Sequence, residues 1–88
     1  MPRYLVERSF PERLGLDHGG HAGCAALIDA DAQRGVTWLH SYVTPDRHHA
    51  YCIYDGPSPE AIRASAGAQG LPVDRITEVQ MLDPYFLQ

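Results

Sequence analysis

The chain has 88 residues, enough for one small domain spanning 1–88 and too few for two independent hydrophobic cores. Its net charge is −4 and its basic residues are scattered arginines, which argues against nucleic-acid binding and against a polybasic membrane anchor. No apolar run approaches the ~20 residues of a membrane span, and no signal-peptide core follows the N-terminus. We therefore expect a cytoplasmic protein in which Cys24 and Cys52 are free thiols.

Residues 3–10 are rich in aromatic and branched side chains and are followed by Pro11, a pattern that predicts the first strand. Since side chains alternate along a strand, Tyr4 and Val6 share one face and Glu7 lies on the other.

The next segment, 16–34, is less regular. Asp17 is suited to cap a helix, and Leu27 and Ile28 occupy apolar positions at helical spacing. Glycines weaken the first turn of this helix, and Gly35 is a typical residue to end it.

Residues 36–44 and 49–55 predict two strands that form a hairpin. The length of the connecting loop decides which side chains share a face. We favour a three-residue loop, Pro45 to Arg47, because it puts the strongest aliphatic residues, Ile53 and Val79 among them, on the helix side together with Tyr51. The other face then carries Trp38, His40, Tyr42, Cys52, Tyr54 and Glu7. A four-residue loop would instead send Cys52 to the helix side.

A second helix begins at Ser58, a good N-cap, with Pro59 in the first helical position, and Gly70 and Pro72 end it. Residues 76–82 predict the last strand, and an aromatic tail follows Pro84.

The order of these elements is β-α-β-β-α-β, which predicts an α+β, ferredoxin-like sandwich. Right-handed crossovers give a four-stranded antiparallel sheet of order 4-1-3-2 with both helices on one face. The other sheet face carries Trp38, Tyr42 and Tyr54 on this reading, and we expect a second copy to cover it in a homodimer.

Three residues on neighbouring strands of this sheet are candidate metal ligands: Glu7, His40 and Cys52. Strands lie ~4.8 Å apart, so a carboxylate, an imidazole and a thiolate on one face can approach a single transition metal. The alternative is structural, with Cys52 as a buried core residue and His40 as a hydrogen-bonded polar group shielded from water by Trp38 and Tyr42.

Other histidines form weaker candidate clusters. His48 and His49 lie beside Asp46 at the hairpin tip, and His18 and His21 are three residues apart in the glycine-rich segment. No nucleophile elbow, phosphate-binding glycine loop or dinucleotide fingerprint occurs, so no catalytic residue is predicted.

Two motifs carry a resemblance to a known family. They are Cys52-Ile-Tyr-Asp-Gly-Pro-Ser-Pro-Glu-Ala-Ile62 and Gly70-Leu-Pro-Val-Asp-Arg-Ile-Thr-Glu-Val79, and the segments 3–11 and 36–43 fit the same pattern. The chain resembles a family of small bacterial proteins, formerly a domain of unknown function, whose members are often described as nickel-binding. The resemblance implies a dimeric ferredoxin-like sandwich that binds metal at histidine-rich positions. The chain departs from the family at Ser65, where many relatives carry histidine.

We therefore expect a cytoplasmic, dimeric binding protein for nickel or another divalent transition metal. One alternative is a small monooxygenase- or isomerase-like enzyme with a pocket around His40, lined by Trp38, Tyr42 and Tyr54. Another is a non-catalytic dimerisation module whose aromatic sheet face is the interface.

Overall fold

The computed structural model describes residues 1–11 and 27–85. Its elements are β1 (Arg3–Ser9), β2 (Thr37–Val43), β3 (His49–Asp55), α2 (Pro59–Gln69) and β4 (Arg75–Val79), and residues 27–32 are also helical. The predicted Asp17 cap, Cys24 and the pair His18 and His21 fall outside the described residues.

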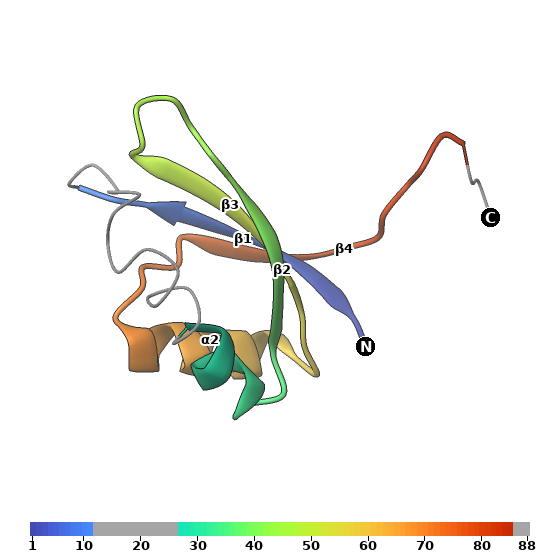
Figure 1. The fold of residues 1–88 in the computed structure, drawn as a ribbon, viewed down its shortest axis with the longest axis horizontal. Coiled ribbons are helices and arrows are strands. Elements are labelled where there is room, and N and C mark those ends of the chain that lie inside the picture. The colour runs from blue at the N-terminus through green and yellow to red at the C-terminus, as the bar shows by residue number, and fades with distance from the viewer. Residues whose placement is uncertain (12–26, 86–88) are drawn as a thin grey trace.

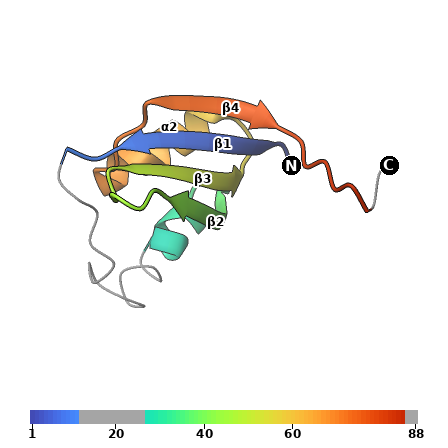
Figure 2. The same ribbon diagram turned by 90° about the horizontal axis from the view of Figure 1, so that it is seen from above.

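The four strands form one antiparallel sheet in the order β2-β3-β1-β4. This is the order predicted from the sequence, and Figure 2 shows the strands side by side. Figure 1 shows α2 and the helical residues 27–32 on the same side of the sheet. The α+β, ferredoxin-like prediction is confirmed, and among the described residues the second sheet face has no helix over it. We call this second face, on which Leu5 and Glu7 of β1 lie, the open face.

Helix α2 begins and ends where its sequence signals predict. The Ser58 hydroxyl accepts a hydrogen bond from the Ala61 amide at 3.2 Å, and Pro59 follows as the first helical residue. Gly70 takes a left-handed conformation with φ of 68°, and the Leu71 amide bonds the Ala66 carbonyl at 2.9 Å. The helix thus has satisfied backbone groups at both ends.

The helical residues 27–32 end in the same way. Gly35 has φ of 71°, and its amide bonds the Ala32 carbonyl at 3.1 Å. Val36 then turns into the core at 2% exposure, which anchors the start of β2.

The core lies between the sheet and the helices. Strand β1 lies between β3 and β4 in the sheet. Every second residue of β1 is buried in the core, because successive side chains of a strand point to opposite faces of the sheet. The fully packed cluster is Tyr4, Val6, Val36, Ala50, Cys52, Tyr54 and Ile62.

The loop between β2 and β3 has four residues, 45–48, so the three-residue prediction is wrong. The Thr44 amide bonds the His49 carbonyl at 3.0 Å, which closes the hairpin one residue later than expected. The Asp46 carboxylate accepts from the Thr44 hydroxyl at 2.6 Å and from the His48 amide at 3.0 Å. These two hydrogen bonds lower the pKa of Asp46, and Arg47 completes the turn with φ of 62°.

This register exchanges the two faces of β3. Cys52 lies opposite Val6 on the helix side, and Tyr54 lies opposite Tyr4. Tyr51 and Ile53, expected inside, lie on the open face with Val79 of β4. The face assignments of Cys52, Tyr51 and Ile53 were therefore wrong, because the loop length shifts every side chain by one position.

Strand β2 contains a second irregularity, a bulge between Trp38 and His40. Trp38 pairs with Tyr54 on the helix side, whereas His40 pairs with Ile53 on the open face. The extra residue, Leu39, breaks the alternation that predicted Trp38 and His40 on one face.

Candidate functional site

His40 lies on the open face, in the edge strand β2, and its side chain is exposed. Its ring packs against that of Tyr42 in a T-shaped arrangement, with a centroid distance of 5.3 Å and an interplanar angle of 85°. The expected shielding from water is absent because the bulge moves Trp38 to the opposite face and because β2 is an edge strand of the sheet among the described residues.

Glu7 lies on the same open face as His40, but it is in β1, which pairs with β3 and β4 and not with β2. It lies opposite Tyr51 of β3 and Arg75 of β4, and its carboxylate is 3.9 Å from the Arg75 guanidinium. Strand β3 separates Glu7 from β2, so two strand spacings, about 10 Å, lie between the strands of Glu7 and His40.

Cys52 is a free thiol, 6% exposed, in the core on the other face of the sheet. The structure therefore does not bring Glu7, His40 and Cys52 together. Within residues 1–11 and 27–85, no group of three or more His, Cys, Asp or Glu side chains is placed to hold a metal ion.

The pocket expected around His40 is also not formed by its predicted residues. Trp38 and Tyr54 lie on the helix side, and Tyr54 instead contacts Arg8. Arg8 is only 4% exposed and donates to the Tyr54 hydroxyl at 3.1 Å and to the Pro72 carbonyl at 2.7 Å. Burial raises the pKa of Tyr54, and the positive charge of Arg8 opposes that shift. The sequence prediction missed Arg8, although alternation with Tyr4 and Val6 was a signal that could have placed it inside.

A second buried polar group joins the two helical segments. Asp31 is 3% exposed and accepts from the Ser65 hydroxyl at 2.5 Å and from the Gln69 amide at 2.8 Å. Ser65, the position where many relatives are expected to carry histidine, thus has a structural partner here.

The open face does hold one connected polar cluster, at its His49 end. The Ser9 hydroxyl donates to the Asp74 carboxylate and lies 3.3 Å from His49 Nδ1. Since the single hydroxyl proton goes to Asp74, His49 Nδ1 must donate its hydrogen to Ser9. Neutral His49 then has an unprotonated Nε2. We call Ser9, His49 and Asp74 the relay cluster.

Sequence reasoning missed the relay cluster because its members are far apart in the chain. Ser9 and Asp74 are separated by 65 positions and Ser9 and His49 by 40. Strand register pairs Ser9 with His49, and the Asp74 amide bonds the Glu7 carbonyl at 2.8 Å at the entry to β4. A doublet of histidines after a predicted turn was the only signal available.

The other members of the hairpin-tip cluster make separate contacts. His48 Nδ1 lies 2.9 Å from the Phe10 carbonyl oxygen, to which it donates. The Asp46 carboxylate is held by Thr44 and by the His48 amide. His48, His49 and Asp46 therefore do not converge on one point.

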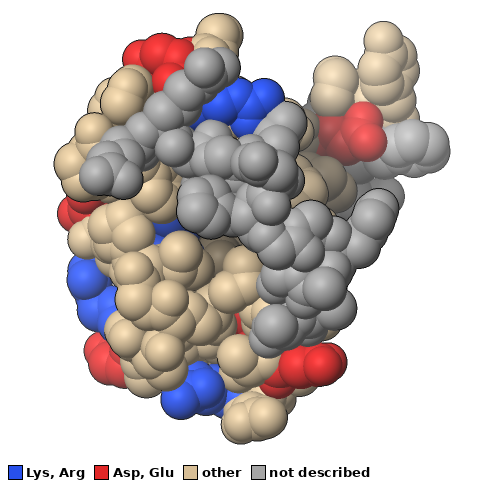
Figure 3. All heavy atoms as spheres, turned by 60° about the vertical axis from the view of Figure 1, so that its left-hand side comes forward, with Lys and Arg blue, Asp and Glu red and all other residues tan. Residues whose placement is uncertain are grey.

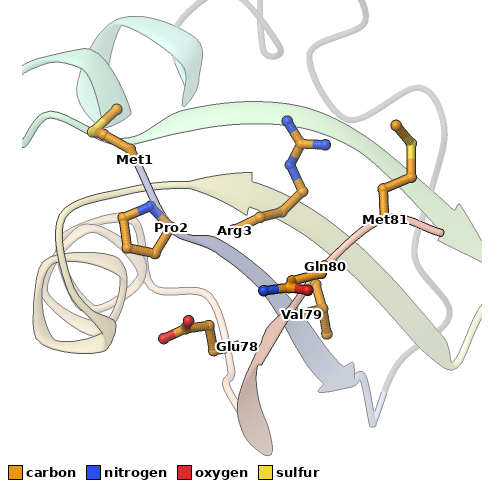
Figure 4. Close-up of a pocket in the computed structure, with 7 residues that line it drawn as sticks. All are labelled: Met1, Pro2, Arg3, Glu78, Val79, Gln80 and Met81. Carbon is orange, nitrogen blue, oxygen red and sulfur yellow. The ribbon is translucent and has the colours of Figure 1, made fainter. Parts of the chain in front are cut away.

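A shallow hollow of about 300 Å³ lies at the opposite end of the sheet, between the N-terminal residues and the end of β4 (Figure 4). Its lining is Met1, Pro2, Arg3, Glu78, Val79, Gln80 and Met81. Arg3 donates to Asp55 at 2.9 and 3.3 Å, and this hydrogen bonding lowers the pKa of Asp55.

On the side of the molecule seen in Figure 3, described acidic and basic side chains are interspersed rather than gathered into one patch. In the described part of the chain, no helix has the length and apolar character needed to cross a bilayer.

A comparison of the sequence with models of known protein families gives a match. The model for nickel responsive proteins similar to SCO4226 matches residues 4–79. The chain belongs to the SCO4226-like family. The resemblance found in the sequence motifs is thereby confirmed.

One solved structure supports the same fold. The crystal structure of SCO4226 from Streptomyces coelicolor A3(2) superposes with a TM-score of 0.77 at 21% sequence identity. The alignment covers 92% of this chain and 99% of that chain. No curated protein matches the chain.

Proposed function

We propose that this SCO4226-like protein binds Ni²⁺, or another divalent transition metal, at the open face of its sheet. The description of its family as nickel responsive supports the choice of metal. The observation that carries the proposal is the relay cluster, in which the Asp74 carboxylate, the Ser9 hydroxyl and His49 Nδ1 form one chain of hydrogen bonds.

This arrangement resembles the support that proteins give to metal-binding histidines. A ligating imidazole usually donates a hydrogen bond from the N–H of its other ring nitrogen to an acceptor, which fixes the tautomer and orients the ring. Here Ser9 accepts from Nδ1, so His49 Nε2 keeps its lone pair and its side chain is exposed to solvent. Imidazole nitrogen is a suitable ligand for nickel.

The sequence-predicted donors keep different places in this proposal. His40 and Glu7 stay on the open face, where they supply further donors if a second subunit brings them near an ion. Cys52 has no part, because it is buried on the opposite face. A single protomer therefore offers few donors to one ion, and water fills the remaining positions, so we expect exchangeable rather than permanent binding.

We also propose that the protein is a homodimer that packs through the open face. Leu5 and Ile53 lie partly buried at its centre, with Tyr51 39% and Tyr42 64% exposed beside them. The described helices cover only the other face. An apolar surface of this kind is typical of an interaction site. Sedimentation at tens of micromolar showing only a 9.7 kDa species would contradict dimerisation.

Calorimetric titration of tag-free protein with NiCl₂, paired with native mass spectrometry, tests the metal site. His49→Ala should abolish the nickel heat, and Ser9→Ala should weaken binding about 10- to 100-fold by releasing the ring. His48→Ala is the matched control, because its Nδ1 is bonded to a backbone carbonyl outside the cluster.

The same titration separates the rival sites. Full binding by His49→Ala with loss in His40→Ala would contradict the relay cluster and favour the edge strand. Absence of nickel binding by the wild type would contradict the proposed metal function as a whole.

A further inference from the structure

The relay cluster fixes which ring nitrogen of His49 carries the proton. An ionised carboxylate only accepts hydrogen bonds, so Asp74 takes the one hydroxyl proton of Ser9. Ser9 then offers only a lone pair to His49 Nδ1, which lies 3.3 Å from the Ser9 oxygen and donates to it. The direction of both hydrogen bonds is therefore set at the Asp74 end of the cluster.

The tautomer imposed in this way is the opposite of the one that a free imidazole prefers. In an unconstrained neutral histidine, the proton lies mainly on Nε2, and Nδ1 is the free nitrogen. In His49 the proton is held on Nδ1 by the bond to Ser9, and the lone pair of Nε2 is left for a ligand. The cluster thus makes available the nitrogen that would otherwise carry the proton.

Asp74 is exposed, but the backbone that carries it is held in place. Its amide donates to the Glu7 carbonyl at 2.8 Å, at the entry to β4. Two residues earlier, the Pro72 carbonyl accepts from the Arg8 guanidinium at 2.7 Å, and Arg8 is only 4% exposed. The connection from α2 to β4 is therefore fixed by hydrogen bonds from β1.

Neighbouring residues of β1 hold this connection from the two faces of the sheet. Arg8 lies on the helix side, where it bonds Pro72, and Ser9 lies on the open face, where it bonds Asp74. Figure 2 shows the end of β1 and the starts of β3 and β4 at the same end of the sheet. The position of the backbone thus brings the Asp74 carboxylate to Ser9, and only the side-chain torsions of Asp74 remain to be fixed.

We propose that Asp74, acting through Ser9, selects the metal-binding tautomer of His49. Asp74 is a positioning residue in this role, because it contacts Ser9 and not the ion. A metal on Nε2 draws electrons from the imidazole ring, and a carboxylate at the far end of the hydrogen bonds supports that change. This inference rests on the metal site proposed above, but the tautomer is a property of the metal-free protein and is measured without nickel.

The first test measures the tautomer directly. Nitrogen NMR of isotopically labelled, metal-free protein at a pH of about 8, where an ordinary imidazole is neutral, distinguishes a protonated ring nitrogen from an unprotonated one. Wild-type His49 should carry its proton on Nδ1. In Asp74→Ala the Ser9 hydroxyl proton is free to turn toward Nδ1, so the ring proton should move to Nε2 in most molecules. A His49 tautomer that is the same in both proteins overturns the proposal.

Two other histidines are internal controls in the same spectra. His48 Nδ1 donates to the Phe10 carbonyl, so the His48 proton should stay on Nδ1 in Asp74→Ala. His40, whose ring packs against Tyr42, should likewise keep its wild-type signals. Unchanged signals from both histidines exclude misfolding, whereas shifts as large as that of His49 would overturn the assignment of the effect to the relay cluster.

The second test connects the tautomer to the metal. Asp74→Ala should weaken nickel binding about 10- to 100-fold in calorimetric titration, the usual effect of losing a group that supports a ligating histidine. Asp29→Ala, which removes an exposed carboxylate on the helix side, is the matched control and should bind nickel as the wild type does.

The two tests together separate this inference from the metal function itself. A tautomer that shifts in Asp74→Ala without a change in nickel affinity overturns the positioning role. Absence of nickel binding by the wild type contradicts the proposed metal function, and the NMR comparison still decides whether Asp74 selects the tautomer of His49.

Discussion

Cys52 lies directly opposite Val6 across the β1–β3 pair, on the face of the sheet that the helices cover. Its neighbour Ile53 lies opposite Leu5 on the open face. This one relationship removes the thiol from the surface that carries His40 and Glu7, so Cys52 is not part of the metal site that we propose at the relay cluster.

The position of Cys52 predicts how the thiol behaves. Cys52→Ala should leave nickel stoichiometry and affinity unchanged and lower the free energy of unfolding by about 1 kcal/mol, through the loss of a buried sulfur. Titration calorimetry and urea denaturation measure the two effects. A loss of nickel binding in Cys52→Ala with the fold intact would reverse the assignment of the thiol to the core.

Gly67, inside α2, and Gly70, just past its end, should respond in opposite directions to the same substitution. Gly67 is in the helix with no atom within 4 Å of an added Cβ, so Gly67→Ala should stabilise the protein by about 0.5–1 kcal/mol. Gly70 has φ of 68°, so Gly70→Ala should cost about 1 kcal/mol. The two denaturation midpoints, measured against wild type, check both signs. Equal shifts for the pair would contradict the helix end at Gly70.

Asp31 ties the helical residues 27–32 to α2. Asp31→Ala leaves the buried Ser65 hydroxyl and the Gln69 amide without their shared acceptor, and should lower the free energy of unfolding by about 2–3 kcal/mol. Asp29→Ala, two positions earlier and exposed, is the control and should change it by less than about 0.5 kcal/mol. Chemical denaturation of the two variants distinguishes a buried contact from a general effect of charge.

Stability should fall in acid partly through Asp55. Its hydrogen bonds from Arg3 place the folded-state pKa below the ordinary value of 3.8. The unfolded chain therefore binds the proton first, and the contribution of Asp55 is complete above that value and disappears as the pH falls through the lower, folded-state pKa. Asp55→Asn should flatten this part of the stability–pH curve. Asp29→Asn, an exposed aspartate on the helix side, is the control. An acid limb identical in wild type and Asp55→Asn would show that the Arg3 pair does not persist in solution.

Local signals in the sequence determined most of the fold. Ser58, Pro59 and Gly70 act within one turn of the helix they bound, and Gly35 ends the preceding helical residues, so neighbouring residues suffice to predict them. The order of elements then restricts the sheet to few arrangements, because crossovers are right-handed. The strand order and the placement of both helices on one face followed from the sequence for these reasons.

The faces of β2 and β3 were decided only by the tertiary structure. A four-residue loop held by Asp46 and a bulge at Leu39 each shift the alternation of side chains by one residue, and neither has a strong local signal. The relay cluster depends on the same register, since Ser9, His49 and Asp74 meet only when three distant segments pair. Composition and spacing thus predicted the sandwich, whereas the long-range pairing of its strands determined which side chains face one another.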